Sequence, residues 1–204
     1  MMKNIWLILT LAGSFALGGV PPAAAVTLTL VPSPSTIQVG GTISVDLLIA
    51  GLAPSGPPSL GAFLVETTYN SSVSTYNSVV FAGFLGNPGN AVETDIVVDT
   101  SMPGVVSLEE DSFLSTAVLD ALQTTDPFLL ATLTFTGSAA GVSPLGFGAI
   151  DLSSAAGTSL TNPTLQGASV TVTSMPEPGT LTLLAPFAVM AGAWRWRKGL
   201  PRQG

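Results

Sequence analysis

The chain has 204 residues and a formal net charge of −7, and between Val26 and Met175 it carries eleven Asp and Glu residues but no Lys, Arg or His. Such an acidic segment excludes nucleic acid as a partner, because it would repel a phosphate backbone. The chain contains no Cys and no His, which excludes disulfides, Cys zinc sites, thiol nucleophiles and Ser-His-Asp catalysis.

Residues 1–25 have the pattern of a secretory signal peptide. Lys3 supplies the positive start, the segment from Ile5 to Leu17 is apolar, and Ala23-Ala24-Ala25 provides the small residues of a cleavage site. We therefore expect cleavage between Ala25 and Val26 by the secretion machinery, with an uncleaved N-terminal anchor as the alternative. A lipid anchor is excluded, because its attachment requires a Cys thiol.

Residues 26–174 are expected to form one domain of short strands. Alternation of apolar with polar residues, together with enrichment in Val and Thr, predicts strands at 26–31, 42–49, 60–69, 73–81, 93–100, 105–109, 128–136 and 165–173. Short strands at intervals of about ten residues, separated by Gly and Pro, predict an all-β sandwich.

Pro and Gly residues indicate where the turns of this domain lie. Pro32 and Pro34 are expected to end the first strand, and Gly40-Gly41 to form a turn. The strands at 93–100 and 105–109 are expected to pair as a hairpin around Met102-Pro103-Gly104. Residues 112–122 are ambiguous: one interpretation is a short helix capped by Ser112 and ended by Asp126-Pro127. Its apolar residues would be Leu114, Val118, Leu119 and Leu122.

The C-terminal segment, residues 175–199, has three parts in a fixed order. A Pro-Glu-Pro-Gly motif comes first, an uncharged apolar run of fifteen residues follows at 180–194, and a basic cluster closes the segment. Fifteen helical residues span about 22 Å, and Trp and basic side chains at the interface can supply the rest of a hydrocarbon core of about 30 Å. We expect a single transmembrane helix, with a buried helix of the domain as the alternative. The motif is Pro176, Glu177, Pro178 and Gly179, and the basic cluster is Arg195, Arg197 and Lys198.

This arrangement closely resembles the PEP-CTERM sorting signal of exported bacterial proteins. The resemblance implies recognition by an exosortase, a membrane thiol protease, with processing near Pro176–Pro178. Basic residues at both ends of the chain and none between them also satisfy the positive-inside rule, which places the intervening domain outside the inner membrane. We expect transient anchoring in the inner membrane of a Gram-negative bacterium, followed by release to the cell surface, biofilm or extracellular matrix.

A second resemblance covers most of residues 27–173. The order of five segments is similar to that of the cohesin domain family, which implies a jelly-roll β-sandwich related to bacterial carbohydrate-binding modules. The family turn usually carries Tyr-Asp, and Asn70 stands at the Asp position, where it serves a turn equally well. Cellulosomal cohesins bind dockerins, but no dockerin-contact motif matches this chain, so the resemblance implies only a general adhesion or scaffolding module. The segments are Val39–Val45, Leu60–Val65, Tyr69–Val73, Leu130–Phe135 and Asp151–Gly157.

Two further uses of the acidic residues remain open. A glycoside hydrolase would need two carboxylates across a cleft, although acids on exposed strand faces also serve solubility. Calcium prefers such oxygen ligands, and the predicted hairpin would bring Asp95 and Asp99 towards Glu109-Glu110-Asp111, but no calcium-loop motif is present. We assign no catalytic residue, no metal ligand and no cofactor. The hydrolase candidates are Glu66, Glu93, Asp95, Asp99, Glu109, Glu110 and Asp111.

Binding of an exopolysaccharide is the main alternative to binding of a surface protein. Sugar-binding modules usually present flat aromatic platforms, but all three Trp residues lie in the signal peptide and the tail. The remaining candidates are Tyr69, Tyr76 and Phe84, the last in a loop where it is expected to be exposed. The other strand aromatics are expected in the core, namely Phe63, Phe81, Phe128 and Phe135.

Overall fold

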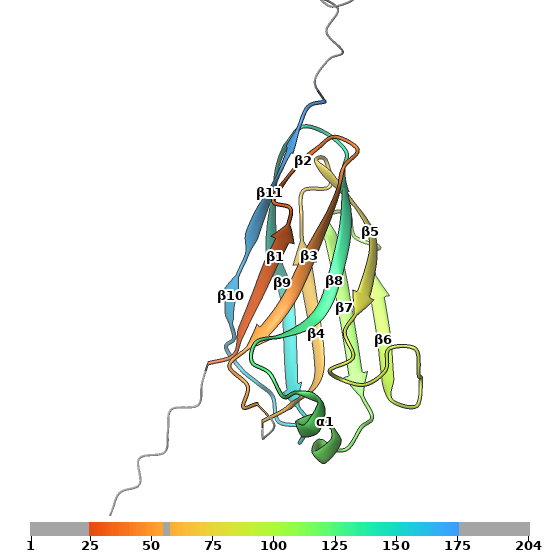
Figure 1. Cartoon of the computed structure of the whole chain (residues 1–204), viewed down its shortest axis with the longest axis vertical. Helices are drawn as coiled ribbons and strands as arrows, with labels where there is room; N and C mark the ends of the chain where they lie inside the picture. Colours follow the sequence, from red (N-terminus) through yellow and green to blue (C-terminus); the bar gives the residue numbers. More distant parts are fainter. Residues whose placement is uncertain (1–24, 55–57, 176–204) are drawn as a thin grey trace, which may run out of the picture.

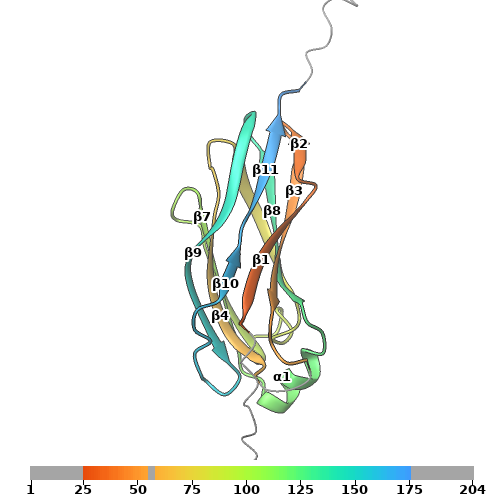
Figure 2. The same cartoon turned by 90° about the vertical axis from the view of Figure 1, so that its left-hand side faces the viewer.

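Two β-sheets pack face to face as an elongated sandwich (Figures 1 and 2). The computed structural model describes residues 25–54 and 58–175. The five-stranded sheet has the order β10 (Thr164–Gln166), β1 (Thr27–Ser33), β3 (Thr42–Ala50), β8 (Phe128–Gly137) and β5 (Ser74–Phe81). The six-stranded sheet has the order β2 (Thr36–Gln38), β11 (Ala168–Thr173), β9 (Gly141–Ser154), β4 (Leu60–Thr68), β7 (Val105–Ser112) and β6 (Thr94–Asp99).

The start of β1 and the end of β11 lie at opposite ends of the sandwich (Figures 1 and 2). The helix α1 (Thr116–Leu122) covers the end at which β1 begins. The strand pairs β10–β1 and β2–β11 are parallel, and the other neighbouring strands are antiparallel.

The composition of the core follows from the alternation of apolar and polar residues along each strand. In β3, Ile43, Val45, Leu47 and Ile49 are at most 1% exposed, whereas the residues between them face solvent. Near the end of β8, the Phe135 ring lies 5.1 Å from that of Tyr69 and 5.9 Å from that of Tyr76, measured between centroids. Burial of each large apolar side chain contributes about 1.5–3 kcal/mol, so the facing sheets supply most of the stability of the domain. The predicted β-sandwich is confirmed.

Seven of the eight predicted strands are each present as one strand, but the prediction that Pro32 ends the first strand was wrong. Pro32 pairs with Val45, and β1 continues to Ser33. Because β10 pairs only with Thr27–Thr29, the other edge of β1 is free at Pro32, where a missing N–H removes no sheet hydrogen bond.

The strand predicted at 165–173 is two strands in different sheets. β10 joins β1, whereas β11 joins β9 and β2. Gly167 lies between them, and a Cβ at this position would meet the Leu145 carbonyl oxygen at 2.6 Å. The chain therefore changes sheet at a residue that has no side chain to clash.

The helix begins later than predicted. Its N-cap is Ser115, whose side chain makes no capping hydrogen bond. Ser112 is instead the last residue of β7, and its hydroxyl donates to the Leu85 carbonyl at 2.6 Å. The same hydroxyl accepts a local hydrogen bond from Leu114 N at 3.2 Å, so it stabilises the end of β7, and the helix starts at Thr116.

The predicted β6–β7 hairpin is confirmed, and its turn yields a stability test. Gly104 has φ +81°, and a Cβ there would lie 2.9 Å from the Tyr69 carbonyl oxygen. Gly157 has φ +75°, with no atom within 4 Å of its Cβ position. We expect Gly157→Ala to cost about 1 kcal/mol from left-handed backbone strain, and Gly104→Ala to cost about 1–2 kcal/mol more, because a clash is added. Urea unfolding of both variants measures the difference, and equal losses would contradict the clash.

The predicted terminal segments lie outside the described residues. These are the signal peptide before Ala25, the sorting motif, the apolar run and the basic cluster. Within residues 25–54 and 58–175, no helix is long and apolar enough to cross a membrane. Of the predicted cleavage residues, Ala25 is exposed, and the Val26 carbonyl accepts a hydrogen bond from Thr164 N at 2.8 Å.

Candidate functional site

The strands β9, β4, β7 and β6 present an outer surface rich in carboxylates. The register places Asp111 between Asp95 and Ala62. No Lys, Arg or His between Val26 and Met175 balances these charges, so the surface attracts cationic groups. We call it the acidic face, and its carboxylates are Glu66, Asp95, Asp99, Glu109, Asp111 and Asp151.

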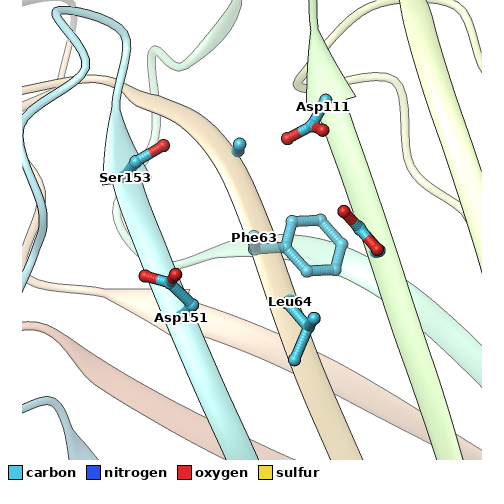
Figure 3. A pocket seen from close by; sticks show the side chains of 7 residues that line it. Phe63, Leu64, Asp111, Asp151 and Ser153 are labelled. Carbon is cyan, nitrogen blue, oxygen red and sulfur yellow. The ribbon is translucent and has the colours of Figure 1, made fainter.

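A shallow hollow of about 170 Å³ lies on the acidic face. Figure 3 shows Asp111 and Asp151 on either side of β4, with Leu64 between them on that strand and Ser153 further along β9. Glu109 also lines the hollow. Ligand pockets usually measure about 300 Å³ or more, so this hollow suits a protruding side chain better than a sugar unit.

Like charges face each other across β6 and β7. Asp95 pairs directly with Asp111, and such cross-strand pairs are unfavourable. At the far end of β6, the Ser101 N–H donates to Asp99 Oδ1 at 2.8 Å, and this hydrogen bond lowers the pKa of Asp99. The hydrogen bond from Ser101 therefore favours the ionised form of Asp99 at this edge of the face.

Glu66 helps to shape the face. The Ala149 N–H donates to Glu66 Oε2 at 2.8 Å, where the pairing of β4 with β9 is interrupted by a register shift between Val65 and Thr67. At Gly148, the Glu66 carboxylate occupies the space that a Cβ would need. Glu66 is thus a structural member of the acidic face that fixes the irregular part of β9.

The carboxylates proposed as calcium ligands do not gather. Asp95 and Asp99 lie on the same face of β6, four residues apart, which corresponds to about 13 Å along a strand. Within the described segments, no group of three or more Asp or Glu side chains could hold a metal ion. The hairpin forms as expected, but it spreads these side chains along the sheet.

Two of the hydrolase candidates are absent from the acidic face. Glu110 points into the sandwich, is 0% exposed, and burial raises its pKa to about 8. Glu93 lies in the loop before β6, where its carboxylate accepts hydrogen bonds from Asn87 N and Asn90 Nδ2, both at 2.9 Å. The buried position of Glu110 was not anticipated, because the predicted strand stopped at Glu109.

The aromatic residues proposed for sugar binding are half-buried and pack against the core. Tyr69 and Tyr76 both lie against Phe135, and Phe84 lies 5.0 Å from Phe128 between ring centroids. The prediction of an exposed Phe84 was therefore wrong. Phe113 is 61% exposed, but it follows the end of a strand and carries no sequence signal for sugar binding.

Comparison with known proteins identifies the fold. No protein-family model and no curated protein sequence matches the chain. Among solved structures, it is similar to a type I cohesin of Pseudobacteroides cellulosolvens, with a TM-score of 0.58 and 15% identity over 76% of this chain and 96% of that one.

Two further structures extend this likeness. A type I cohesin–dockerin complex from Clostridium thermocellum matches with a TM-score of 0.58 and 12% identity over 72% of this chain and 99% of that one. A non-cellulosomal cohesin from the archaeon Archaeoglobus fulgidus matches with a TM-score of 0.53 and 12% identity over 78% and 98% of the two chains. The expected cohesin-like fold is therefore confirmed: the described domain is an all-β sandwich of the cohesin type.

Proposed function

We propose that this domain is a non-enzymatic protein-binding or scaffolding module, which docks a cationic protein surface on its acidic face. The observation that carries the proposal is an open sheet surface with many carboxylates and no basic residue in the domain to neutralise them. Cohesin structures with the same fold include one in complex with a dockerin, which supports a role in protein binding without naming the partner.

The geometry favours a protein over a sugar. A partner Lys or Arg reaching the hollow would meet Glu109, Asp111 and Asp151 together. Val97, 49% exposed beside Glu109, adds apolar contact on the same face. Charged pairs surrounding an apolar contact accelerate association and select the partner, whereas a sugar platform requires exposed aromatic rings.

The test compares two variants of equal net charge. The face variant carries Glu109→Gln, Asp111→Asn and Asp151→Asn. The control carries Asp46→Asn, Asp120→Asn and Asp126→Asn, none of which lies on a strand of the acidic face. Full-length protein is immobilised, proteins captured from the extracellular fraction of the producing cells are purified, and their affinities are measured. We expect the face variant to lose at least about tenfold in affinity and the control less than about twofold. Equal losses, or capture of polysaccharide by both variants, would contradict the proposal.

We further propose that the protein is exported, held in the inner membrane by its C-terminal segment, and released to the cell surface or matrix by an exosortase. The support is the sequence pattern of the signal peptide, the Pro-Glu-Pro motif at 176–178 and the basic residues at both ends. Anchoring through residues after β11 would direct the α1 end of the sandwich away from the membrane (Figure 1).

A reporter fused after Gly204 tests this topology. An enzyme that is active only in the cytoplasm should be active in the fusion, because the basic cluster is expected to stay inside. Replacing Arg195, Arg197 and Lys198 with Gln should weaken this orientation. A periplasmic reporter in the unaltered chain would contradict the proposed anchor.

A further inference from the structure

Glu110 occupies an unusual position for a charged residue. It lies on β7, faces the interior and is 0% exposed. Its direct cross-strand neighbours are Phe63 on β4 and Ile96 on β6. Within the described part of the chain, neither of its carboxyl oxygens has a hydrogen-bond partner. A buried carboxyl group without partners is strongly unfavourable when ionised, so the folded arrangement favours the protonated form.

No charged group in the surroundings compensates Glu110. On the opposite sheet, the Phe81 ring on β5 stacks at 6.2 Å on that of Phe63. The carboxylates of Glu109 and Asp111 on β7, and that of Asp95 on β6, lie on the outer surface of the sheet, opposite to Glu110. The Glu93 carboxylate, in the loop before β6, is held by Asn87 and Asn90. The groups that titrate near Glu110 are thus all acidic, and none can neutralise its negative charge.

The strand β6 is the element that can move away from the sandwich when Glu110 is ionised. It lies at the edge of the six-stranded sheet, and within the described residues its one strand partner is β7. Val97 and Val98 on β6 are already 49% and 38% exposed. Lifting β6 would break the β6–β7 ladder and the hydrogen bonds from Thr94 to the carbonyls of Asn87 and Asn90. Exposing Glu110 from the side of β4 would instead separate two inner strands of the sheet.

We propose that Glu110 is a pH-sensitive latch on the β6–β7 hairpin. With Glu110 protonated, the hairpin stays closed on the sandwich; when Glu110 loses its proton, β6 separates and water reaches the carboxylate. Because β6 carries Asp95 and Asp99, opening would also remove two of the six carboxylates from the acidic face, while Glu109 and Asp111 stay with β7. That consequence for binding rests on the proposed function, but the opening itself requires no partner.

Amide hydrogen exchange of the full-length protein in detergent, read by mass spectrometry, tests the latch. After correction for base catalysis, we expect protection of residues 94–112 to fall at least about tenfold between about pH 6 and pH 9. Peptides of β1, β3 and β8 serve as the internal reference and should keep their protection. In Glu110→Gln the fall should disappear, and in the control Glu109→Gln, on the opposite face of the same strand, it should persist.

The outcomes separate the latch from the proposed function. Loss of protection throughout the sandwich, or the same pH dependence in Glu110→Gln, would overturn the latch. Glu110→Leu serves as a second variant if the unpaired amide of Gln impairs folding, and it should also remove the pH dependence. Because no partner is present in the exchange experiment, failure to bind a protein on the acidic face would leave this result unchanged.

Discussion

Replacement of Gln123 with alanine is expected to lower the free energy of unfolding by about 3 kcal/mol. Gln123 follows α1 and is 2% exposed. Its Oε1 accepts a hydrogen bond from Leu60 N at 2.7 Å, and its Nε2 donates to Leu60 O at 2.8 Å and to Phe84 O at 3.2 Å. One side chain thus satisfies backbone groups of two separate segments.

The size of the stability loss expected for Gln123→Ala follows from the position at which β7 ends. Ala62 on β4 pairs with Asp111, but β7 ends at Ser112, so Leu60 has no residue of β7 beside it. The Gln123 amide takes that place and completes the ladder. Without it, buried backbone groups of Leu60 and Phe84 lose their partners, at about 1–3 kcal/mol for each group. Water entering the vacated space recovers part of this cost.

Urea unfolding of the full-length protein measures the loss. Gln166→Ala is the matched control, because Gln166 is exposed and its side chain makes one long hydrogen bond, at 3.4 Å from Thr29 Oγ1. We expect the control to change stability by less than about 0.5 kcal/mol. If the two variants lose the same amount, the Gln123 amide does not hold β4 in place.

Regular alternation made most of the fold predictable. β3 buries every second residue, and β4 and β8 do so apart from one irregular step each. This pattern is visible in the sequence because each strand has one face in the core. β9 was not predicted, although it is the longest strand with fourteen residues. It contains Pro144, Gly146 and Gly148, residues that normally interrupt strands, and tertiary contacts such as that with Glu66 override their preference.

The acidic face was only partly predictable. The hairpin prediction brought β6 and β7 together, but the contribution of Asp151 depends on β9, whose pairing with β4 joins residues distant in sequence. The inward position of Glu110 does follow from the period of two that begins with Val106 and Leu108. The strand predicted at 105–109 ends one residue before Glu110, and burial of an unpaired charge is unusual. The bonds of Gln123 have no sequence signal, since Leu60 lies 63 residues away.

Replacement of Glu110 with leucine is expected to stabilise the domain at alkaline pH. Burial raises the pKa of Glu110 to about 8, whereas an unfolded chain ionises Glu near pH 4.3. Between these two values the unfolded state binds fewer protons than the folded state, so the free energy of unfolding falls as pH rises. The stability due to Glu110 is fully present below the unfolded pKa and is lost as pH rises through the folded pKa.

The expected gain in the free energy of unfolding is smaller than the full pKa shift of Glu110 implies. A shift of this size corresponds to about 5 kcal/mol by linkage, but opening of the edge strand lets water relax around the charge, and we expect about 2–3 kcal/mol. Urea unfolding at several pH values should therefore show Glu110→Leu more stable than the unaltered protein by about this amount near pH 9, and within about 1 kcal/mol near pH 5.

Glu109→Leu provides the matched control, because it removes a carboxylate from the same strand but from its outer face. This variant should retain the alkaline loss of stability. If Glu110→Leu destabilises the domain equally at all pH values, the Glu110 carboxyl group is hydrogen-bonded in solution by buried water, and its ionisation does not set the alkaline limit of the fold. If the alkaline loss disappears only in Glu110→Leu, one buried carboxyl group accounts for it, although ten other acids lie between Val26 and Met175.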